Sequence, residues 1–425
     1  MSSIIEVLEE RGFIESKTSE SFRPYSEDSV RLYAGFDPTG DSLHIGHLIP
    51  LMGLAWFQKF GHQPIALIGG ATALVGDPSG KDKERPLLSE DTVNQNIEGI
   101  RRNLHQVLDF ENESTKPLVL NNYDWHSRFT FIDFLRDVGK YFRLGTMLSK
   151  ESVKKRLQSD EGMSYTEFAY QTLQGYDFYH LFKEHKVCLQ LGGSDQWGNI
   201  IAGTELVRKL TSKEVYGVTF PLLTRSDGKK FGKTEGGAIW LSSDRCSPYD
   251  FYQYLYGTPD ADVVKFMRLL TFMDMAEIQK YEELLKDPES PPNQAQKRLA
   301  QEVTRIVHGE EGLRIAEEVT SAARPGSQAS LDAKTLESLA GDMPTVTLQR
   351  QDLIGLSYID LLVKIDLQKS KGEARRLIRN GGAYLNNKKI VDEDFQLSND
   401  EFIEDRLILV GAGKKKKVLV KVINS

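Results

Sequence analysis

The sequence has little cysteine, no long apolar run and no excess of positive charge. Only Cys188 and Cys246 occur in 425 residues, too few for a disulfide framework or a cysteine zinc site. No stretch approaches the roughly 20 apolar residues of a transmembrane helix, so no membrane partner is expected. The acidic N-terminal segment lacks the basic start and apolar run of a leader, which predicts a cytoplasmic location.

The formal net charge of −7 argues against binding of nucleic acid over the whole surface. The end of the chain differs, because residues 351–425 hold 14 Lys and Arg against 11 Asp and Glu, whereas the remainder holds 40 against 50. An acidic body with a basic C-terminal region predicts that a nucleic acid is bound locally, at that end.

The order of strand-like and helix-like segments predicts an α/β fold with a Rossmann-like parallel sheet. Residues 30–36 and 65–68 have the pattern of buried strands, and residues 46–60 between them that of a helix. We expect a mostly helical insertion at about 85–185, after which the sheet resumes at 187–191. Ligands of such sheets bind beyond the carboxyl ends of the strands, and the turn at 37–47 lies at that edge.

Composition further along the chain predicts three more regions. The first domain covers residues 1–246 and is followed by an α-helical domain at 247–323. Residues 324–350 contain Pro-Gly-Ser and Gly-Asp-Met-Pro and are predicted to be a linker. Residues 351–425 show a small α+β pattern with a basic helix at 370–380.

The turn at 37–47 contains the sequence Asp37-Pro38-Thr39-Gly40-Asp41-Ser42-Leu43-His44-Ile45-Gly46-His47. A helix start offers unpaired N–H groups and a partial positive charge to a phosphate, and Gly46 would let a nucleotide lie against the backbone. His44 and His47 are three residues apart and could stabilise phosphoryl oxygens together with the Thr39 hydroxyl. A His-x-x-His pair is more often without function, and a zinc site would need further ligands, so no metal site is predicted.

Residues Gly76-Asp77-Pro78-Ser79-Gly80-Lys81 look superficially like a Walker P-loop. The glycine spacing is wrong, and Asp82 follows Lys81 where Ser or Thr is required. We therefore reject a P-loop.

A second glycine-rich element lies at residues 224–237 and contains Lys230-Phe231-Gly232-Lys233-Thr234. Taken alone, a lysine-rich loop is usually a solvated surface loop. Paired with the histidine turn, it predicts a mobile clamp on the β- and γ-phosphates of a nucleotide.

The segment Ser164-Tyr165-Thr166-Glu167 predicts a capped helix start. Tyr170, Gln174 and Asp177 follow at i, i+4 and i+7 and therefore share one face. A solvated face is the ordinary explanation, but Leu173 beside them favours an inward face that needs polar partners. Gly193 and Asp195 follow the strand at 187–191, where either a ribose site or a generic turn is possible.

These motifs resemble those of class I aminoacyl-tRNA synthetases. The run to His47 resembles the HIGH motif and Lys230–Thr234 the KMSKS loop, with Phe231, Gly232 and Thr234 departing from the consensus. Ala34 also departs, because a ribose-contacting cysteine is common there in relatives. Further segments are similar to bacterial tyrosyl-tRNA synthetases: Gly69-Gly70-Ala71-Thr72, Gly76-Asp77-Pro78, Asn121-Asn122-Tyr123-Asp124-Trp125 and Gly192-Gly193-Ser194-Asp195-Gln196-Trp197-Gly198-Asn199.

The resemblance implies a role for each candidate residue. Tyr33 and Asp177 would bind the phenol of tyrosine. Tyr170, Gln174 and Asp77 would bind its α-amino group, and Gln196 would lie beside its carboxyl group. The ATP-binding residues would be Asp37, Gly46, Gly193, Asp195, Lys81, Arg85 and Lys233, and the catalytic contacts Thr39, His44, His47, Lys230 and Lys233.

Clustered basic residues predict contacts with RNA, and the resemblance indicates the domains that would make them. Lys150, Lys154, Arg208 and Lys209 would contact the acceptor stem, although an ordinary charged helix face is about as plausible for each. Lys371, Arg375 and Arg379 form one basic stripe on the helix at 370–380, in a region similar to S4-type RNA-binding domains. The helical region 247–323 would face the anticodon.

The implied activity is ATP-dependent activation of L-tyrosine and its transfer to tRNA(Tyr). Mg²⁺ is expected on the ATP phosphates, with no prosthetic group, and the family is homodimeric. Two alternatives stay open: another HIGH-type enzyme, such as a tryptophan-specific synthetase or a small nucleotidyltransferase, and a non-catalytic RNA-binding protein. The pair Tyr33 and Asp177 argues against the first, and the intact histidines and lysines against the second.

Overall fold

The computed structural model describes residues 3–22, 24, 29–79, 88–159, 162–234, 237–322, 333, 336–337, 344–413 and 416–423. The chain forms two compact units, Met1–Cys246 with Leu255–Val307, and Ser247–Tyr254 with His308–Ser425. The predicted domain at 247–323 is therefore divided. The division coincides with Gly309, whose non-helical backbone (φ 70°, ψ −178°) interrupts the long helix α13 (Gln294–Ala322).

The first unit is built around a six-stranded sheet in the order β1-β6-β5-β2-β3-β4. β1 is antiparallel to β6, and the other neighbouring pairs are parallel. The strands are β1 (Ser16–Lys17), β2 (Arg31–Phe36), β3 (Gln63–Ile68), β4 (Leu118–Asn121), β5 (Val187–Gly193) and β6 (Tyr216–Phe220). This sheet agrees with the predicted Rossmann-like fold.

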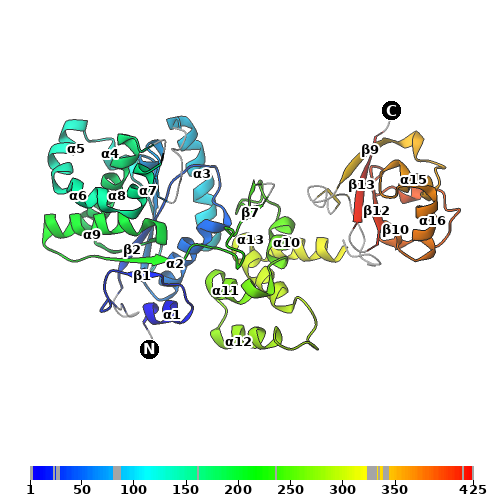
Figure 1. The fold of residues 1–425 in the computed structure, drawn as a ribbon, viewed down its shortest axis with the longest axis horizontal. Helices are drawn as coiled ribbons and strands as arrows, with labels where there is room; N and C mark the ends of the chain where they lie inside the picture. Colours follow the sequence, from blue (N-terminus) through cyan, green and yellow to red (C-terminus); the bar gives the residue numbers. More distant parts are fainter. Residues whose placement is uncertain are drawn as a thin grey trace. The chain divides into compact units, whose positions relative to one another are not determined.

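Helices cover both faces of this sheet. Figure 1 shows α8 and α9 on one side of the strands and α2 and α3 on the other. The helices of the unit are α1 (Ile4–Glu10), α2 (Leu48–Lys59), α3 (Glu90–Val107), α4 (Tyr123–His126), α5 (Phe131–Asp137), α6 (Leu144–Ser149), α7 (Glu151–Leu157), α8 (Tyr165–His185), α9 (Trp197–Thr211), α11 (Asp260–Leu270), α12 (Met275–Leu284) and the first part of α13.

Side chains alternate between the two faces of the sheet along each strand, and apolar side chains on both faces pack against helices. Tyr33, Ile65 and Leu67 pack with Phe178 and Leu181 of α8 in one apolar cluster. The opposite face approaches α2 so closely that a Cβ on Gly53 would lie 2.5 Å from the ring of Phe220. Because side chains of a strand alternate between faces, a sheet buried on both sides reads as a nearly continuous apolar run.

The predicted helical insertion is wrong in one respect, because it contains a strand of the sheet. β4 pairs in parallel with β3 over Ile65–Ile68. It covers four residues at the edge of the sheet, and a run this short between helices carries little periodic signal.

Arg11 ties the N-terminal helix to the end of α11. Its guanidinium donates to the carbonyl oxygens of Arg268 (2.8 Å), Met273 (2.7 Å) and Thr271 (2.8 Å) and lies 4.7 Å from the ring centre of Trp56. The side chain is almost fully buried, and burial lowers its pKa to about 10. The last carbonyls of a helix have no partner within it, so this guanidinium serves as their cap.

Replacing Arg11 with Met is expected to destabilise the first unit by about 3 kcal/mol, because several buried carbonyls lose a charged donor. Denaturation followed by tryptophan fluorescence measures this, since all four tryptophans of the chain lie in this unit. Arg101→Met is the control, because the partly exposed pair of Arg101 with Glu98 contributes less than about 1 kcal/mol. Equal midpoints for the two variants would contradict the capping role.

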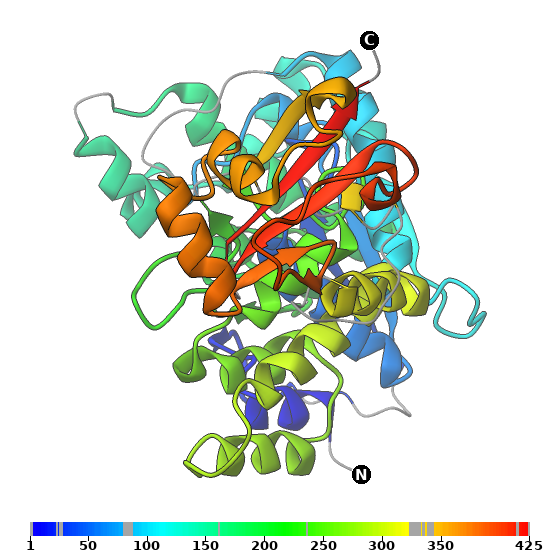
Figure 2. The same ribbon diagram turned by 90° about the vertical axis from the view of Figure 1, so that its right-hand side faces the viewer.

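The second unit contains a five-stranded sheet in the order β11-β10-β12-β13-β9. Figure 2 shows the long strands β12 and β13 side by side, in red. The elements are β9 (Thr345–Gln349), α15 (Tyr358–Lys364), α16 (Lys371–Arg379), β10 (Ala383–Leu385), β11 (Lys388–Lys389), β12 (Leu407–Ala412) and β13 (Lys416–Ile423), with most of α10 (Pro248–Tyr256) and the second part of α13.

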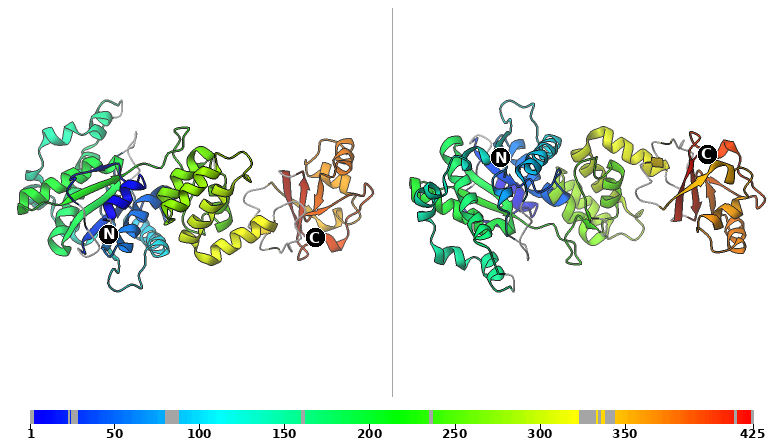
Figure 3. Two further views of the ribbon diagram at one scale, coloured as in Figure 1. Left: turned by 90° about the horizontal axis from the view of Figure 1, so that it is seen from below. Right: turned by 90° about the horizontal axis from the view of Figure 1, so that it is seen from above.

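Each face of this sheet has its own apolar cluster. Ile408, Val410 and Val420 pack with α15 and α16, which lie along one face (Figure 3). Leu407, Leu409 and Leu419 point the other way and pack with Tyr249 of α10 and Val319 of α13. The second cluster explains why parts of α10 and α13 belong to the C-terminal unit.

The predicted linker at 324–350 ends too late. Thr345–Gln349 forms β9, which pairs in parallel with β13 over Leu419–Ile423. The pairing joins segments 70 or more residues apart, which local composition does not reveal. Residues 324–332, 334–335 and 338–343 of this stretch lie outside the described part of the chain.

His308, at the start of the second unit, is expected to make that unit acid-sensitive. Burial lowers its pKa from 6.5 to about 4, and Nε2 has no hydrogen-bond partner in the described residues. Below pH 6.5, His308 binds a proton in the unfolded chain but stays neutral in the folded chain down to about pH 4. The free energy of unfolding therefore falls by up to about 3 kcal/mol between pH 6.5 and 4. Hydrogen exchange of amides beyond residue 308 measures this loss, and His308→Leu should flatten the pH dependence; an unchanged slope would contradict the assignment.

Candidate functional site

A cavity of about 410 Å³ lies in the first unit at the carboxyl ends of β2, β3 and β5. Three groups of predicted residues meet there: the histidine turn, the lysine loop and the polar face of α8. The lining includes Tyr33, Asp37, Thr39, His44, Gly46, His47, Asp77, Tyr170, Gln174, Asp177, Gly193, Asp195, Gln196, Lys230 and Lys233. The sheet edge predicted from sequence is therefore the edge that carries the cavity.

The histidine turn forms a short 3-10 helix, η1 (Ile45–His47), that leads into α2. The backbone N–H of Gly46 donates to His44 Nδ1 (3.1 Å), and the N–H of His44 donates to His47 Nδ1 (3.3 Å). The two rings stack with their centres 3.9 Å apart. A Cβ on Gly46 would lie 2.8 Å from His44 Cε1, so glycine is needed for this stacked pair as well as for access to the backbone.

The lysine loop lies against the histidine turn. A Cβ on Gly232 would lie 2.2 Å from Ile45 Cγ2, and the φ of Gly232 is +87°, so both space and backbone favour glycine. The N–H of Ile239 donates to Gly232 O (2.9 Å), and the N–H of Ile45 donates to Ile239 O (2.8 Å). Lys230 and Lys233 are exposed side chains on the rim of the cavity.

The same loop is fastened to helix α11. The backbone N–H and the Oγ of Ser226 donate to Asp262 (2.8 and 3.2 Å), and Lys265 Nζ donates to Thr224 O (3.0 Å). The rings of Phe231 and Phe266 lie with their centres 4.1 Å apart. Phe231 is therefore an apolar anchor, which explains why a large apolar residue stands between the two lysine positions.

Asp177 lies at the closed end of the cavity, 2% exposed. Trp125 Nε1 and His126 Nε2 lie 2.8 Å from its Oδ1, and Asn122 Nδ2 donates to Oδ2 (3.0 Å). The hydroxyl of Tyr33 is buried in the same cavity with no hydrogen-bond partner in the described residues. Burial, and then the charge of Asp177, raise the pKa of Tyr33, so this phenol stays neutral.

A second polar network lies beside Tyr170. Its hydroxyl donates to Asp37 Oδ2 (2.8 Å), and Thr72 Oγ1 donates to Asp37 Oδ1 (2.7 Å). Gln196 Nε2 donates to Asp77 Oδ2 (2.7 Å), and Gln174 Nε2 donates to Gln196 Oε1 (3.3 Å). The prediction that this helix face is polar and points inward is confirmed. The network also brings two carboxylates, those of Asp37 and Asp77, to the wall of the cavity.

Asp195 stands at the opposite wall, after β5. Burial raises its pKa, and the neighbouring charge of Asp77 raises it further, while Lys230 opposes the shift. A Cβ on Gly193 would lie 2.6 Å from Asp195 Oδ1, so glycine is required for this carboxylate to fold back over the strand end. The site thus has carboxylates on the inner walls and ammonium groups on the rim.

Several residues of the site carry no role in the sequence interpretation. Asn122 and Trp125 occur in a segment cited for its resemblance, but no contact was assigned to them. Asn199 donates to Gln174 Oε1 (2.9 Å) and Ser79 lines the cavity. His126 had no signal in the sequence, because its importance depends on a bond to a residue 51 positions away.

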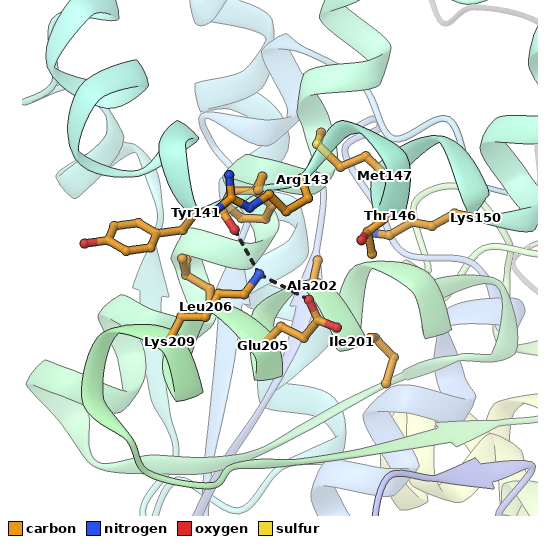
Figure 4. Close-up of a pocket in the computed structure, with 11 residues that line it drawn as sticks. Tyr141, Arg143, Thr146, Met147, Lys150, Ile201, Ala202, Glu205, Leu206 and Lys209 are labelled. Carbon is orange, nitrogen blue, oxygen red and sulfur yellow. Dashed lines mark hydrogen bonds and ion pairs between the residues drawn. The ribbon is translucent and has the colours of Figure 1, made fainter.

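Of the predicted phosphate contacts, Lys81 and Arg85 lie outside the described residues. The acceptor-stem candidates fall into two groups. Lys154 and Arg208 are exposed. Figure 4 shows Lys150 and Lys209 at a small cavity of about 20 Å³, where Lys209 Nζ donates to Tyr141 O (2.9 Å).

The prediction for Lys150 is contradicted by its burial. Its Nζ is inaccessible and has no hydrogen-bond partner in the described part of the chain, and burial lowers its pKa to about 8. Its stem packs against Gly198, where a Cβ would lie 3.2 Å from Lys150 Cδ. As it lies, this ammonium reaches no RNA phosphate. Arg156, two residues after Lys154, is also buried, in an ion pair with Glu167 (2.7 Å).

The predicted basic stripe of the second unit lies on α16. Lys371, Arg375 and Arg379 are all exposed. Lys371 pairs with Asp360, and Arg379 pairs with Glu393, whose pKa this contact lowers. The stripe is present, with acidic partners at both ends.

A search of the described residues finds no group of three or more His, Cys, Asp or Glu side chains that could hold a metal ion. Among these residues, every helix is too short or too polar to cross a membrane.

Two family models match the chain. The model for class I tRNA synthetases (W and Y) matches residues 25–323, and the model for the tyrosine–tRNA ligase SYY-like C-terminal domain matches residues 335–420. The chain is 56% identical to the tyrosine–tRNA ligase of Protochlamydia amoebophila over 423 residues, which covers 100% of both chains. It is 49% identical to the chloroplastic/mitochondrial tyrosine–tRNA ligase of Arabidopsis thaliana, over 99% of this chain and 84% of that protein.

One solved structure with a similar fold is the C-terminally truncated mitochondrial tyrosyl-tRNA synthetase of Aspergillus nidulans. The TM-score is 0.66 at 32% identity, with 74% of this chain and 92% of that chain covered.

Proposed function

We propose that the cavity joins tyrosine to ATP, because the chain belongs to the tyrosine–tRNA ligase family of class I aminoacyl-tRNA synthetases. The reaction is ATP-dependent activation of L-tyrosine to tyrosyl-adenylate, followed by transfer of tyrosine to the 3′ end of tRNA(Tyr). The observation that supports the assignment of this cavity is the meeting of four predicted elements in it: the histidine turn, the lysine loop, Tyr33 and the polar face of α8.

Tyrosine is proposed to bind with its ring toward Asp177. The phenol would donate to Asp177 and meet the unpartnered hydroxyl of Tyr33. The α-amino group would lie near Tyr170, Gln174 and Asp77, where carboxylate and amide oxygens are concentrated. Gln196 would lie beside the carboxyl group. Each of these contacts with tyrosine would give a buried polar side chain of the cavity a hydrogen-bond partner that it otherwise lacks or shares with a neighbour.

ATP is proposed to lie across the strand ends, with its ribose at Gly193 and Asp195 and its phosphates toward the two stacked histidines. The tyrosine carboxylate attacks the α-phosphate as an anion, so no strong general base is needed. Catalysis then consists of positioning and of stabilising the charge that develops on the pyrophosphate. Thr39 and His44 would contact the γ-phosphate, and His47 would lie nearer the ribose and the helix start. Lys230 and Lys233 would hold the pyrophosphate from the loop. Mg²⁺ would arrive with ATP, held by its phosphates.

The test of this function is ATP–pyrophosphate exchange with each amino acid in turn. Exchange that depends on tyrosine supports the proposal. Exchange with tryptophan would favour the other branch of the matched family model, and no exchange with any amino acid would favour a non-catalytic RNA-binding protein.

The tRNA is proposed to meet Lys154, Arg208 and Lys209 in the first unit and the stripe of α16 in the second. These are exposed basic groups without base-reading geometry, so they are suited to phosphate contacts. The cytoplasmic location stays a prediction, since one relative carries the name chloroplastic/mitochondrial.

A homodimer is proposed because α5 and α6 expose a group of apolar side chains: Phe131 (64%), Ile132 (67%), Leu135 (40%), Leu144 (66%) and Leu148 (42%). A cluster of this kind on consecutive helices is typical of a protein interface.

Ile132→Glu is expected to convert the dimer to a monomer, because a carboxylate would be buried without a partner in the interface. Sedimentation velocity measures the mass. Ile354→Glu, at a comparably exposed apolar residue of the second unit (47%), should leave the mass unchanged. A wild-type monomer, or a dimer that tolerates Ile132→Glu, would contradict the proposal.

A further inference from the structure

The carboxylate of Asp177 has three hydrogen-bond partners before any ligand binds. Asn122, Trp125 and His126 supply them, all from five consecutive residues that follow β4. The side chain of His126 is 7% exposed, and its ring centre lies 5.7 Å from that of Tyr176 and 6.2 Å from that of Phe134. A buried imidazole has no part in the activation chemistry described above, so its contact with Asp177 needs its own explanation.

The positions of the donors decide what Asp177 can still accept. A carboxylate oxygen has two lone pairs. Trp125 and His126 both hydrogen-bond to Oδ1 and so occupy both of its lone pairs, whereas Asn122 occupies one lone pair of Oδ2. One acceptor position therefore remains, on Oδ2, and Asp177 lines the cavity in which the Tyr33 hydroxyl is unpartnered.

We propose that His126 is a positioning residue for substrate selection: by filling the second lone pair of Oδ1, it holds Asp177 in one orientation, with a single vacant position for the tyrosine hydroxyl. The proposal rests on the proposed role of Asp177 in tyrosine binding. Three N–H donors suit a carboxylate that accepts hydrogen bonds and donates none. Without His126, Trp125 alone would address Oδ1, and the carboxylate could rotate or bind a water there.

The proposal predicts a defect confined to tyrosine. In His126→Leu, KM for tyrosine should rise about tenfold and the preference for tyrosine over phenylalanine in kcat/KM should fall about tenfold, the effect of one charge-assisted hydrogen bond. KM for ATP and kcat should stay within about twofold. His126→Gln, which retains an N–H donor, should recover most of the loss.

His180→Leu separates this hydrogen bond from packing. His180 stacks on Trp125 with ring centres 4.2 Å apart, and it approaches the same region from α8. Its removal should change KM for tyrosine by less than about threefold. The proposal is overturned if His126→Leu leaves KM for tyrosine unchanged, if KM for ATP rises in parallel, if Gln rescues no better than Leu, or if His180→Leu has the same effect as His126→Leu.

A measurement on the wild-type protein tests the idea even if these variants fail to fold. The ¹⁵N shifts of the His126 ring should show a protonated Nε2 that is hydrogen-bonded to Asp177. A bare Nε2 would mean that Asp177 donates to it as a neutral acid, which overturns the proposal. Failure of the proposed function is a distinct result, since the wild-type protein would then show no tyrosine-dependent pyrophosphate exchange.

Discussion

Asp177→Ala is expected to abolish most of the preference for tyrosine over phenylalanine, measured as the ratio of kcat/KM in ATP–pyrophosphate exchange. Phenylalanine bound to the wild-type site leaves the Tyr33 hydroxyl and the last position on Asp177 unpaired in a buried cavity. Sites of this kind reject the analogue that lacks the hydroxyl by about 10⁴–10⁵, a magnitude known from tyrosyl-tRNA synthetases themselves and not obtained from any distance in this structure. Removal of the carboxylate should reduce the ratio to the order of 10.

Two comparisons make this result interpretable. Tyr33→Phe removes only one of the two phenol partners, so it should reduce the ratio less than Asp177→Ala does. Asp124→Ala removes an exposed carboxylate two residues before His126 and should leave the ratio unchanged. An unaltered ratio in Asp177→Ala would show that selection takes place elsewhere.

Lys233→Ala is expected to slow adenylate formation about 10²-fold, with KM for tyrosine changed by less than about twofold. Lys233 is an exposed residue of the cavity lining, whereas Asp177, the proposed partner of the phenol, is 2% exposed, so the ammonium is proposed to meet pyrophosphate charge and not the amino acid. Loss of one group aimed at developing charge typically costs about 10²–10³ in rate. Single-turnover formation of tyrosyl-adenylate measures the step directly.

Lys229→Ala is the matched control, because this exposed lysine belongs to the same loop but lies outside the cavity lining. It should retain a rate close to wild type. A large rise in KM for tyrosine with a normal rate in Lys233→Ala would place Lys233 in amino-acid binding and contradict the clamp.

Elements with strong local signals were predictable from the sequence. The helix of Tyr170, Gln174 and Asp177 begins where Ser164 predicts it, since the Ser164 side chain accepts from the N–H of Glu167. The parallel strands at the sheet centre are long and apolar, and the glycine-rich turns that follow them mark the ligand edge. These local signals were sufficient to predict that the residues of the cavity lie at one edge of the sheet.

The features that were missed depend on contacts between distant segments. β4 and β9 are short edge strands whose partners lie far away in the sequence. Lys150 was expected to be exposed because lysine usually is, but its stem packs on Gly198 of α9 and its ammonium is buried. Trp125 and His126 belong to a four-residue helix that Asn122 precedes, so no periodic pattern indicated that His126 points inward.

The attachment of the lysine loop to α11 has a thermodynamic consequence. The loop is held to α11 by three contacts: Ser226 with Asp262, Thr224 with Lys265 and Phe231 with Phe266. A movement of α11 would therefore also move the two ammonium groups of the loop. If the loop binds pyrophosphate as proposed, linkage requires that a ligand that shifts α11 changes the affinity for pyrophosphate by the same factor by which pyrophosphate changes the affinity for that ligand. Occupancy of the proposed phosphate site would therefore be detectable at α11, a helix that contributes no residue to the described lining of the cavity.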